Sequence, residues 1–205
     1  MNAVNLDTTQ LVALAAALGW ASGLRLYAVV FFTGLAGFLG WVALPSGIQV
    51  LQHPVVLGAS GLMLVVEFFA DKIPGVDSVW DAVHTFIRIP AGMALAAGAF
   101  GGDSAVWTTV AALMGGALAA TSHAAKATTR AAANTSPEPF SNIGLSLLGD
   151  AAVPVMLWLA WEHPVWFFVG LTLTTAVMLA LIVVLYRFLR ALLRRWRGEP
   201  APAAS

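Results

Sequence analysis

Two stretches of this sequence gather side chains that can bind ions, move protons or hold phosphate. Residues 67–88 are rich in carboxylates, which bind cations and protons. Residues 123–150 include Lys126 and Arg130, whose cationic groups bind phosphate and other anions. Because a charge near the centre of a bilayer costs at least about 2.5–3.5 kcal/mol, charged clusters in so apolar a chain usually mark a site or a pathway.

The acidic stretch divides at Pro74-Gly75, where a helix is expected to end. Before this break, Glu67 and Asp71 lie four residues apart and therefore on one helix face. Their like charges repel unless a cation or a proton joins them. The spacing therefore predicts a cationic partner close to this pair.

The polar residues after the break form one stripe of a second helix. Asp77, Asp81, His84 and Arg88 follow one another at spacings of four, three and four residues. Asp77 and Asp81 also have the spacing with which membrane prenyl- and phosphatidyl-transferases hold Mg²⁺ against a diphosphate. These two residues are therefore the candidate metal ligands, while no catalytic residue is assigned.

A matching stripe of basic and polar residues lies in the second stretch. His123, Lys126, Arg130 and Asn134 are separated by three, four and four residues. Two interpretations follow: the acidic and basic helices pair at the cytoplasmic surface, or the stripes line a polar cavity for an ion or an anionic headgroup. The number of polar side chains in so apolar a chain favours the cavity.

Arg25 and Asp150 are isolated charges in or beside otherwise apolar helices, and a mutual ion pair would relieve both. Lys72 adds a cation next to Asp71. The candidate substrate- or ion-binding residues are therefore Arg25, Glu67, Asp71, Lys72, Asp77, Asp81, His84, Arg88, His123, Lys126, Arg130, Asn134 and Asp150.

The composition excludes an ordinary soluble domain. Hydrophobic residues make up 60% of the 205 residues and charged residues only 10%, whereas soluble domains carry about 25% charged residues. The mean hydropathy of +0.85 likewise indicates an integral membrane protein. The net charge of zero argues against nucleic-acid binding, and the lack of cysteine excludes disulfides and thiolate metal sites.

Apolar runs predict an all-α, polytopic transmembrane bundle in one integral membrane domain, residues 1–198, followed by a disordered tail, residues 199–205. About seven helices are expected. In a six-span alternative, residues 5–43 form one span that is broken at Gly19 to Gly23, with Arg25 toward the middle of the membrane. The seven expected helices cover residues 5–22, 24–43, 54–71, 78–100, 105–132, 143–161 and 164–195.

Two local patterns recur along the chain, a Thr-Thr pair before an Ala-rich run and a His-Pro-Val triplet. They indicate duplicated three-helix units, residues 5–71 and 105–195, joined by the helix 78–100. Arginines cluster at the end of the last expected helix, and positive residues near the ends of membrane spans stay in the cytoplasm. The C-terminus is therefore expected to be cytoplasmic.

The ordered motifs of the chain resemble a family of small bacterial integral membrane proteins known only as a domain of unknown function. The resemblance covers nearly the whole chain and implies a multi-pass protein of the bacterial inner, or plasma, membrane, but it implies no activity. The residues that carry the resemblance are Ser22-Gly23-Leu24-Arg25; Glu67, Asp71 to Ser78, Trp80, Asp81, His84 and Arg88; Ser122, His123, Lys126, Arg130 and Asn134 to Pro137; and Asp150.

These features predict a small transporter or permease with a cytoplasm-facing polar vestibule for an ion or a small anionic solute. Two alternatives stay open: a membrane enzyme or flippase that acts on a phosphorylated lipid with a divalent metal, and a structural membrane subunit. No cofactor is required, and Mg²⁺ or another cation is left open. The lipid bilayer is the expected partner; an anionic lipid and a second copy of the chain are left open, and nucleic acid is excluded.

Overall fold

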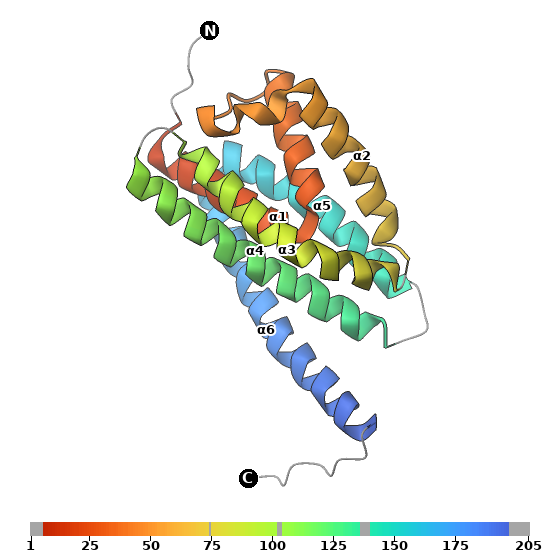
Figure 1. Ribbon diagram of the computed structural model, residues 1–205. Helices are drawn as coiled ribbons and strands as arrows, with labels where there is room; N and C mark the ends of the chain where they lie inside the picture. The colour runs from red at the N-terminus through yellow and green to blue at the C-terminus, as the bar shows by residue number, and fades with distance from the viewer. Residues whose placement is uncertain (1–5, 74, 102–103, 136–139, 197–205) are drawn as a thin grey trace.

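The computed structural model describes residues 6–73, 75–101, 104–135 and 140–196, which form a bundle of helices (Figure 1). These residues contain no β-strand, as expected for an all-α fold. The expected disordered tail at 199–205 lies outside the described residues. The helices are α1 (Thr8–Phe38), the 3₁₀ helix η1 (Ser46–Gln52), α2 (Pro54–Ala70), α3 (Val76–Ala99), α4 (Ala105–Ala133), α5 (Phe140–Glu162) and α6 (Pro164–Trp196).

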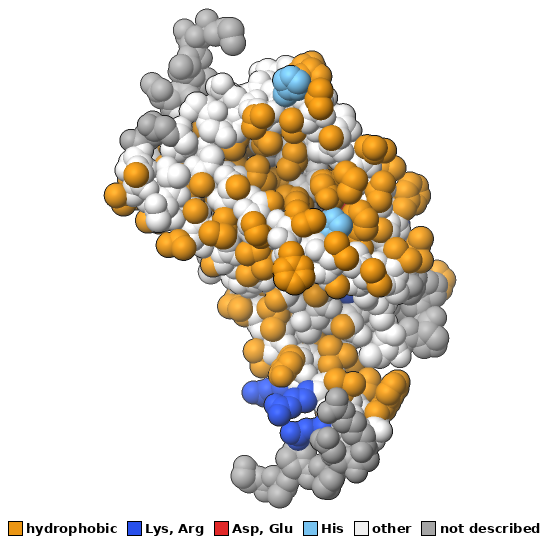
Figure 2. All heavy atoms as spheres, viewed as in Figure 1, with side chains coloured by type: hydrophobic (Ala, Val, Ile, Leu, Met, Phe, Trp, Pro, Cys, Tyr) orange, Lys and Arg blue, Asp and Glu red, His pale blue; other side chains and the backbone are white. Residues whose placement is uncertain are grey.

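Several of these helices are long and apolar enough to cross a membrane. By length and composition α1, α3, α4, α5 and α6 each qualify, and the bent pair of η1 and α2 would add a sixth. Large apolar side chains such as Phe86 and Trp166 are exposed on the outside of the bundle. Figure 2 shows a surface dominated by hydrophobic side chains, with basic side chains gathered near the end of α6. Such a surface suits lipid, and the protein is a membrane protein.

The two helices expected at 5–22 and 24–43 correspond to the two halves of α1, which meet at a kink. The regular backbone of α1 is interrupted at Arg25, whose angles of φ −145° and ψ 75° are not helical. The six-span alternative anticipated one broken helix but placed its break at Gly19 to Gly23. The physical reason for the difference is that both glycines are needed for close packing against α4 and remain helical.

Contacts with α4 fix the direction of the first half of α1. An added Cβ at Gly19 would meet the backbone of Gly115, in the first half of α4. An added Cβ at Gly23 would meet the carbonyl oxygen of Ala119, further along α4. Since later residues of α1 meet later residues of α4, this half runs parallel to α4.

Contacts with α2 show that the second half of α1 turns back. Phe31 lies against Gly61 of α2, whereas Gly34 lies against Leu57, which comes earlier in α2. This half is therefore antiparallel to α2. The chain enters the bundle, turns at Arg25 and returns toward the end of the bundle where α2 begins (Figure 1).

Small residues allow α1 to lie inside the bundle. The side chains of residues 13–17 are at most 1% exposed. At the crossing of α1, α3 and α4, an added Cβ at Gly92 would lie 2.7 Å from the Cβ of Ala119 and 3.4 Å from the carbonyl oxygens of Gly19 and Gly115. The three backbones therefore approach one another more closely than larger side chains would allow.

The opposite end of the bundle collects the helix ends that carry the charges. α2 ends and α3 begins there, and α4 ends and α5 begins there. Arg25, at the turn of α1, reaches the same region from inside the bundle. The fold thereby brings the stretches 67–88 and 123–150 together, whereas α6 runs past them to its C-terminal end (Figure 1).

Replacement of Gly115 by alanine is expected to lower the thermal stability of the purified protein. The new methyl group would lie 2.7 Å from the carbonyl oxygen of Gly92, a backbone atom that cannot easily move away. Overpacking of this kind costs about 1–3 kcal/mol. Gly58→Ala is the matched control, because nothing lies within 4 Å of an added Cβ there. Thermal unfolding in detergent measures the effect, and equal melting temperatures for the two variants would contradict it.

Single cysteines test the course of α1, because the chain has no cysteine of its own. Thr9→Cys and Trp41→Cys place thiols at exposed positions near the two ends of α1. Since α1 turns back, a membrane-impermeant maleimide is expected to reach both thiols from the same side of the membrane. Trp196→Cys, at the far end of α6, should react from the other side. Labelling of the first two cysteines from opposite sides would mean that α1 crosses the bilayer.

Candidate functional site

The ionisable side chains of the two stretches meet in one buried network. Ten ion pairs among the described residues connect five acidic and five basic side chains. The equal numbers make the network electrically neutral when every group is ionised. The acids are Glu67, Asp71, Asp77, Asp81 and Asp150, and the bases are Arg25, Lys72, Arg88, Lys126 and Arg130.

Asp71 joins three cations at the end of α2. It follows the last residue of α2, and its side chain is fully buried. The carboxylate forms an ion pair with Arg25 and lies 3.0 Å from Lys126 Nζ and 3.4 Å from Arg130 Nη2. The main-chain carbonyl of Asp71 also accepts a hydrogen bond of 2.5 Å from Arg130 Nη1. One residue thus ties α1 and α4 to the end of α2.

Arg88 forms a second centre inside α3. Its side chain is fully buried, and Nη2 donates to Glu67 Oε1 at 2.5 Å while Nη1 donates to Asp81 Oδ1 at 2.8 Å. Asp81 Oδ1 also lies 3.0 Å from Lys126 Nζ, which connects this centre to Asp71. The predicted need for cationic partners at Glu67 and Asp71 is therefore confirmed.

The expected ion pair between Arg25 and Asp150 is also confirmed. Arg25 Nη2 lies 2.9 Å from Asp150 Oδ1 and donates a hydrogen bond of 2.7 Å to Ser146 Oγ. Lys72 Nζ lies 3.2 Å from Asp150 Oδ2 at the edge of the network. The side chains of Lys72 and Asp150 are 18% and 22% exposed, so this edge is the most accessible part of the network.

The acidic stripe of α3 and the basic stripe of α4 face each other. Arg130 Nη1 lies 3.2 Å from Asp77 Oδ2, and Asn134 Nδ2 donates to Asp77 Oδ1 at 3.3 Å. The stripes therefore pair, as the first interpretation expected, but they do so inside the bundle. Asp77 and Arg130 are at most 3% exposed, so the paired stripes are buried in the bundle.

Both candidate histidines lie beside the network. His84 Nε2 is 3.1 Å from the Tyr27 hydroxyl and its Nδ1 is 2.8 Å from the Trp80 carbonyl oxygen, which Nδ1 must approach as a donor. His123 Nε2 is 2.7 Å from Thr85 Oγ1, and Arg88 Nη1 approaches His123 Nδ1 at 3.4 Å. The two rings thus extend the network toward α1 and connect α3 with α4.

Several residues of the site did not stand out in the sequence. Ser146 holds the Arg25 guanidinium, and Asn142 donates a hydrogen bond of 2.5 Å to Asn134 Oδ1. Both lie on one face of α5 with Asp150, at successive spacings of four residues. The spacing rule applied to the other stripes would have found them. Tyr27 has no such signal, because it lies alone in an apolar run.

Three buried polar atoms at the Arg88 centre have no hydrogen-bond partner among the described residues. They are Glu67 Oε2, Asp81 Oδ2 and Arg88 Nε. Buried polar groups are normally paired, since an unpaired one keeps the full cost of leaving water. Glu67 Oε2 and Asp81 Oδ2, the latter 3.9 Å from Arg130 Nε, are positions where a proton or a cation can add. Proton or cation uptake is therefore the chemistry that this centre can perform.

Asp77 and Asp81, the candidate magnesium ligands, already interact with cationic and amide side chains. Asp77 contacts Arg130 and Asn134, and Asp81 contacts Arg88 and Lys126. The described residues contain no group of three or more His, Asp or Glu side chains that could hold a metal ion. Magnesium binding at Asp77 and Asp81 stays a prediction, and it would require both carboxylates to exchange these partners.

A double-mutant cycle on Glu67 and Arg88 tests whether the buried charges depend on one another. Arg88→Gln leaves Glu67 without a cationic partner and Glu67→Gln leaves Arg88 with Asp81 alone, so each unbalances the buried charges, at a cost of up to about 3–5 kcal/mol. The double variant removes both charges. Its loss of unfolding free energy is expected to be smaller than the sum of the two single losses by more than about 1 kcal/mol. Unfolding of the four proteins in detergent measures this coupling. Additive losses would show that the two charges do not stabilise each other.

A protein-family model of a domain of unknown function, DUF4126, matches residues 12–187. This range contains all thirteen candidate residues and, except for the first four residues of α1, every helix of the network. No curated protein and no solved structure matches the chain. The expected resemblance is confirmed, and because the match covers most of its length, the chain belongs to the DUF4126 family.

Proposed function

We propose that this protein is a small membrane transporter that carries a small anionic solute together with a proton or another cation. The observation that carries the proposal is the buried, charge-balanced network that closes around Arg25 at the break in α1. Buried ion pairs are no more stabilising than well-packed apolar side chains. Ten such charges in an apolar bundle are therefore better explained by function than by stability.

The break in α1 supports transport. Substrate and coupling-ion sites of many transporters form where a membrane helix is interrupted and its backbone carbonyls become available. Here the carbonyl of Leu24, beside the break, accepts a hydrogen bond of 3.2 Å from Lys126 Nζ, and the Trp20 carbonyl accepts one of 2.7 Å from Ser122 Oγ. Side chains of α4 thus bind directly to backbone groups of α1.

The charge balance supports the coupling to a cation. With five acids and five bases the network is neutral, so a bound anion would leave a net negative charge in a region of low dielectric constant. Uptake of a proton or another cation would restore neutrality. The free oxygens of Glu67 and Asp81 are the positions for this uptake, while Arg25, Lys126 and Arg130 would receive the anion.

Shared partners give the network a way to rearrange. Asp71 pairs with three cations, and Arg130 approaches Asp77 at 3.2 Å and Asp81 at 3.9 Å. A basic side chain that leaves one carboxylate can therefore remain paired with another. In the proposed cycle, such exchanges open the enclosed network into the cytoplasm-facing vestibule and close it again.

The proposal places the protein in the bacterial inner membrane with its C-terminus in the cytoplasm. Arg194 and Arg195 lie in the last turn of α6, and basic residues at the end of a span favour the cytoplasmic side. The helix ends that carry the network lie at the same end of the bundle as this turn. The network would then open toward the cytoplasm.

Flux through liposomes tests the proposal. The purified protein is reconstituted into liposomes that contain a pH-sensitive dye, and inward gradients of chloride, inorganic phosphate and an alkyl phosphate are applied. At least one anion is expected to acidify the interior faster than in protein-free liposomes. Asp71→Asn should reduce this rate at least tenfold, because it removes the carboxylate shared by three cations.

Glu162→Gln is the matched control, since it removes a carboxylate at the end of α5 that lies away from the network. This variant is expected to keep the rate of the unmodified protein. Folding of each variant is checked by its elution as a single species in detergent. Equal rates with and without protein for every anion would contradict the proposal, as would an Asp71→Asn variant that folds and transports normally.

A further inference from the structure

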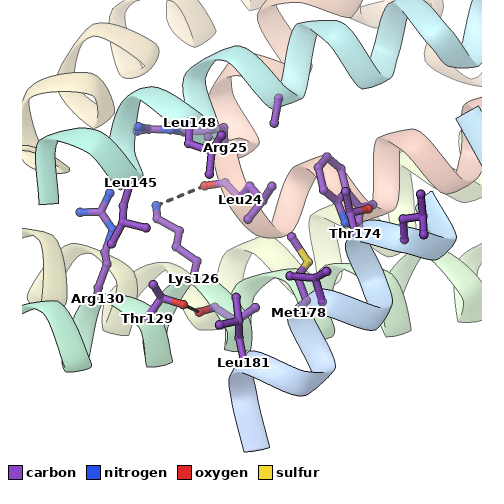
Figure 3. A pocket seen from close by; sticks show the side chains of 16 residues that line it. Leu24, Arg25, Lys126, Thr129, Arg130, Leu145, Leu148, Thr174, Met178 and Leu181 are labelled. Atoms are coloured by element: carbon purple, nitrogen blue, oxygen red, sulfur yellow. Dashed lines mark hydrogen bonds between the residues drawn. The ribbon is translucent and has the colours of Figure 1, made fainter. Parts of the chain in front are cut away.

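A cavity of about 370 Å³ lies beside the network, bounded by α1, α4, α5 and α6 (Figure 3). This volume falls within the range of small-molecule sites, about 300–1,000 Å³. The network occupies only one end of the cavity, and the function proposed above does not use the rest. Two chemically different parts can be distinguished along it.

Apolar side chains form most of the cavity wall. Leu148 on α5 and residues from Leu173 to Leu181 on α6 line it. From Leu173 to Leu181 there are eight steps along α6, which at 1.5 Å per residue is about 12 Å of wall. Leu148 and Leu173 are 67% and 63% exposed, so the same side chains also face the outside of the bundle. The cavity therefore borders the apolar surface that lipid would contact.

Three basic side chains line the other part of the cavity. Arg25, Lys126 and Arg130 line the cavity, whereas none of the described lining residues is acidic. In Figure 3 these three side chains gather at one end, away from Thr174, Met178 and Leu181 of α6. Their acidic partners lie outside the lining. A negatively charged group at this end would take the place of one of these carboxylates beside Arg25, Lys126 or Arg130.

Trp20 contributes a buried, unpaired hydrogen-bond donor to the residues of the cavity wall. It lines the cavity and is only 1% exposed. Its indole Nε1 has no hydrogen-bond partner among the described residues, although a buried indole N–H normally finds an acceptor. An oxygen atom of a bound molecule would satisfy this donor.

We infer that the cavity binds a single-chain anionic amphiphile. Its carboxylate or phosphate meets Arg25, Lys126 and Arg130, and its alkyl chain lies along the wall formed by α5 and α6. Because the cavity borders the apolar surface of the bundle, the alkyl chain would pass from lipid to an equally apolar wall without contacting water. This inference rests on the proposed function insofar as it names the class of anion that is carried; the binding site itself does not require transport.

Native mass spectrometry of the purified protein tests the inference with three probes: dodecyl phosphate, dodecanoate and the zwitterionic dodecylphosphocholine. Ala152→Phe fills the cavity, which Ala152 lines. Ala151→Phe is the matched control, because Ala151 is exposed and does not line the cavity. The unmodified protein and Ala151→Phe are expected to retain an anionic probe at least tenfold more than Ala152→Phe, and tenfold more than the zwitterionic probe.

Met178→Trp fills the cavity from α6 and provides a second variant if Ala152→Phe does not fold. A preference for dodecyl phosphate or for dodecanoate supports the site and identifies its headgroup. Equal retention of the zwitterionic probe, or undiminished retention by a folded cavity-filling variant, would overturn it. Amphiphile binding without anion flux would contradict the proposed transport but support the binding site. Anion flux without amphiphile binding would contradict the binding site but not the proposed transport.

Discussion

Charge balance in a region that water does not reach is the constraint on which this structure depends. An ionised side chain left without a partner in such a region costs several kcal/mol, so each acid must meet a base. The requirement selects which helices come together: Asp71 holds α1 and α4 at the end of α2, and Arg88 holds α3 to the carboxylate of Glu67 in α2. Apolar side chains, which contact lipid and protein equally well, would not specify these neighbours.

The turn at Arg25 places the one charged side chain of α1 within reach of its acidic partners. A break in a membrane helix is tolerated only where the freed backbone groups find other partners inside the protein. The Leu24 carbonyl meets Lys126, and the Arg25 side chain meets Asp71 and Asp150. The glycines and alanines of the first half of α1 make room for it between α3 and α4. Packing and electrostatics thus act on the same short segment.

Spacing rules recovered most of the site from the sequence. The stripes beginning at Asp77 and His123 meet as expected, because spacings of three and four reflect the helix itself. The path of α1 was not recoverable in the same way. Residues 24–43 are apolar enough for a span, and hydropathy reports compatibility with lipid, not direction. Whether the charges line an open vestibule or close on one another likewise depends on long-range contacts, such as that between Arg25 and Ser146.

The position of α1 in the chain has a consequence for the order of assembly. α1 is synthesised before the acids that neutralise Arg25, which belong to the turn after α2 and to α5. A nascent α1 therefore has no acidic partner for the charge of Arg25. Arg25 can therefore complete its ion pairs only after α5 has been made.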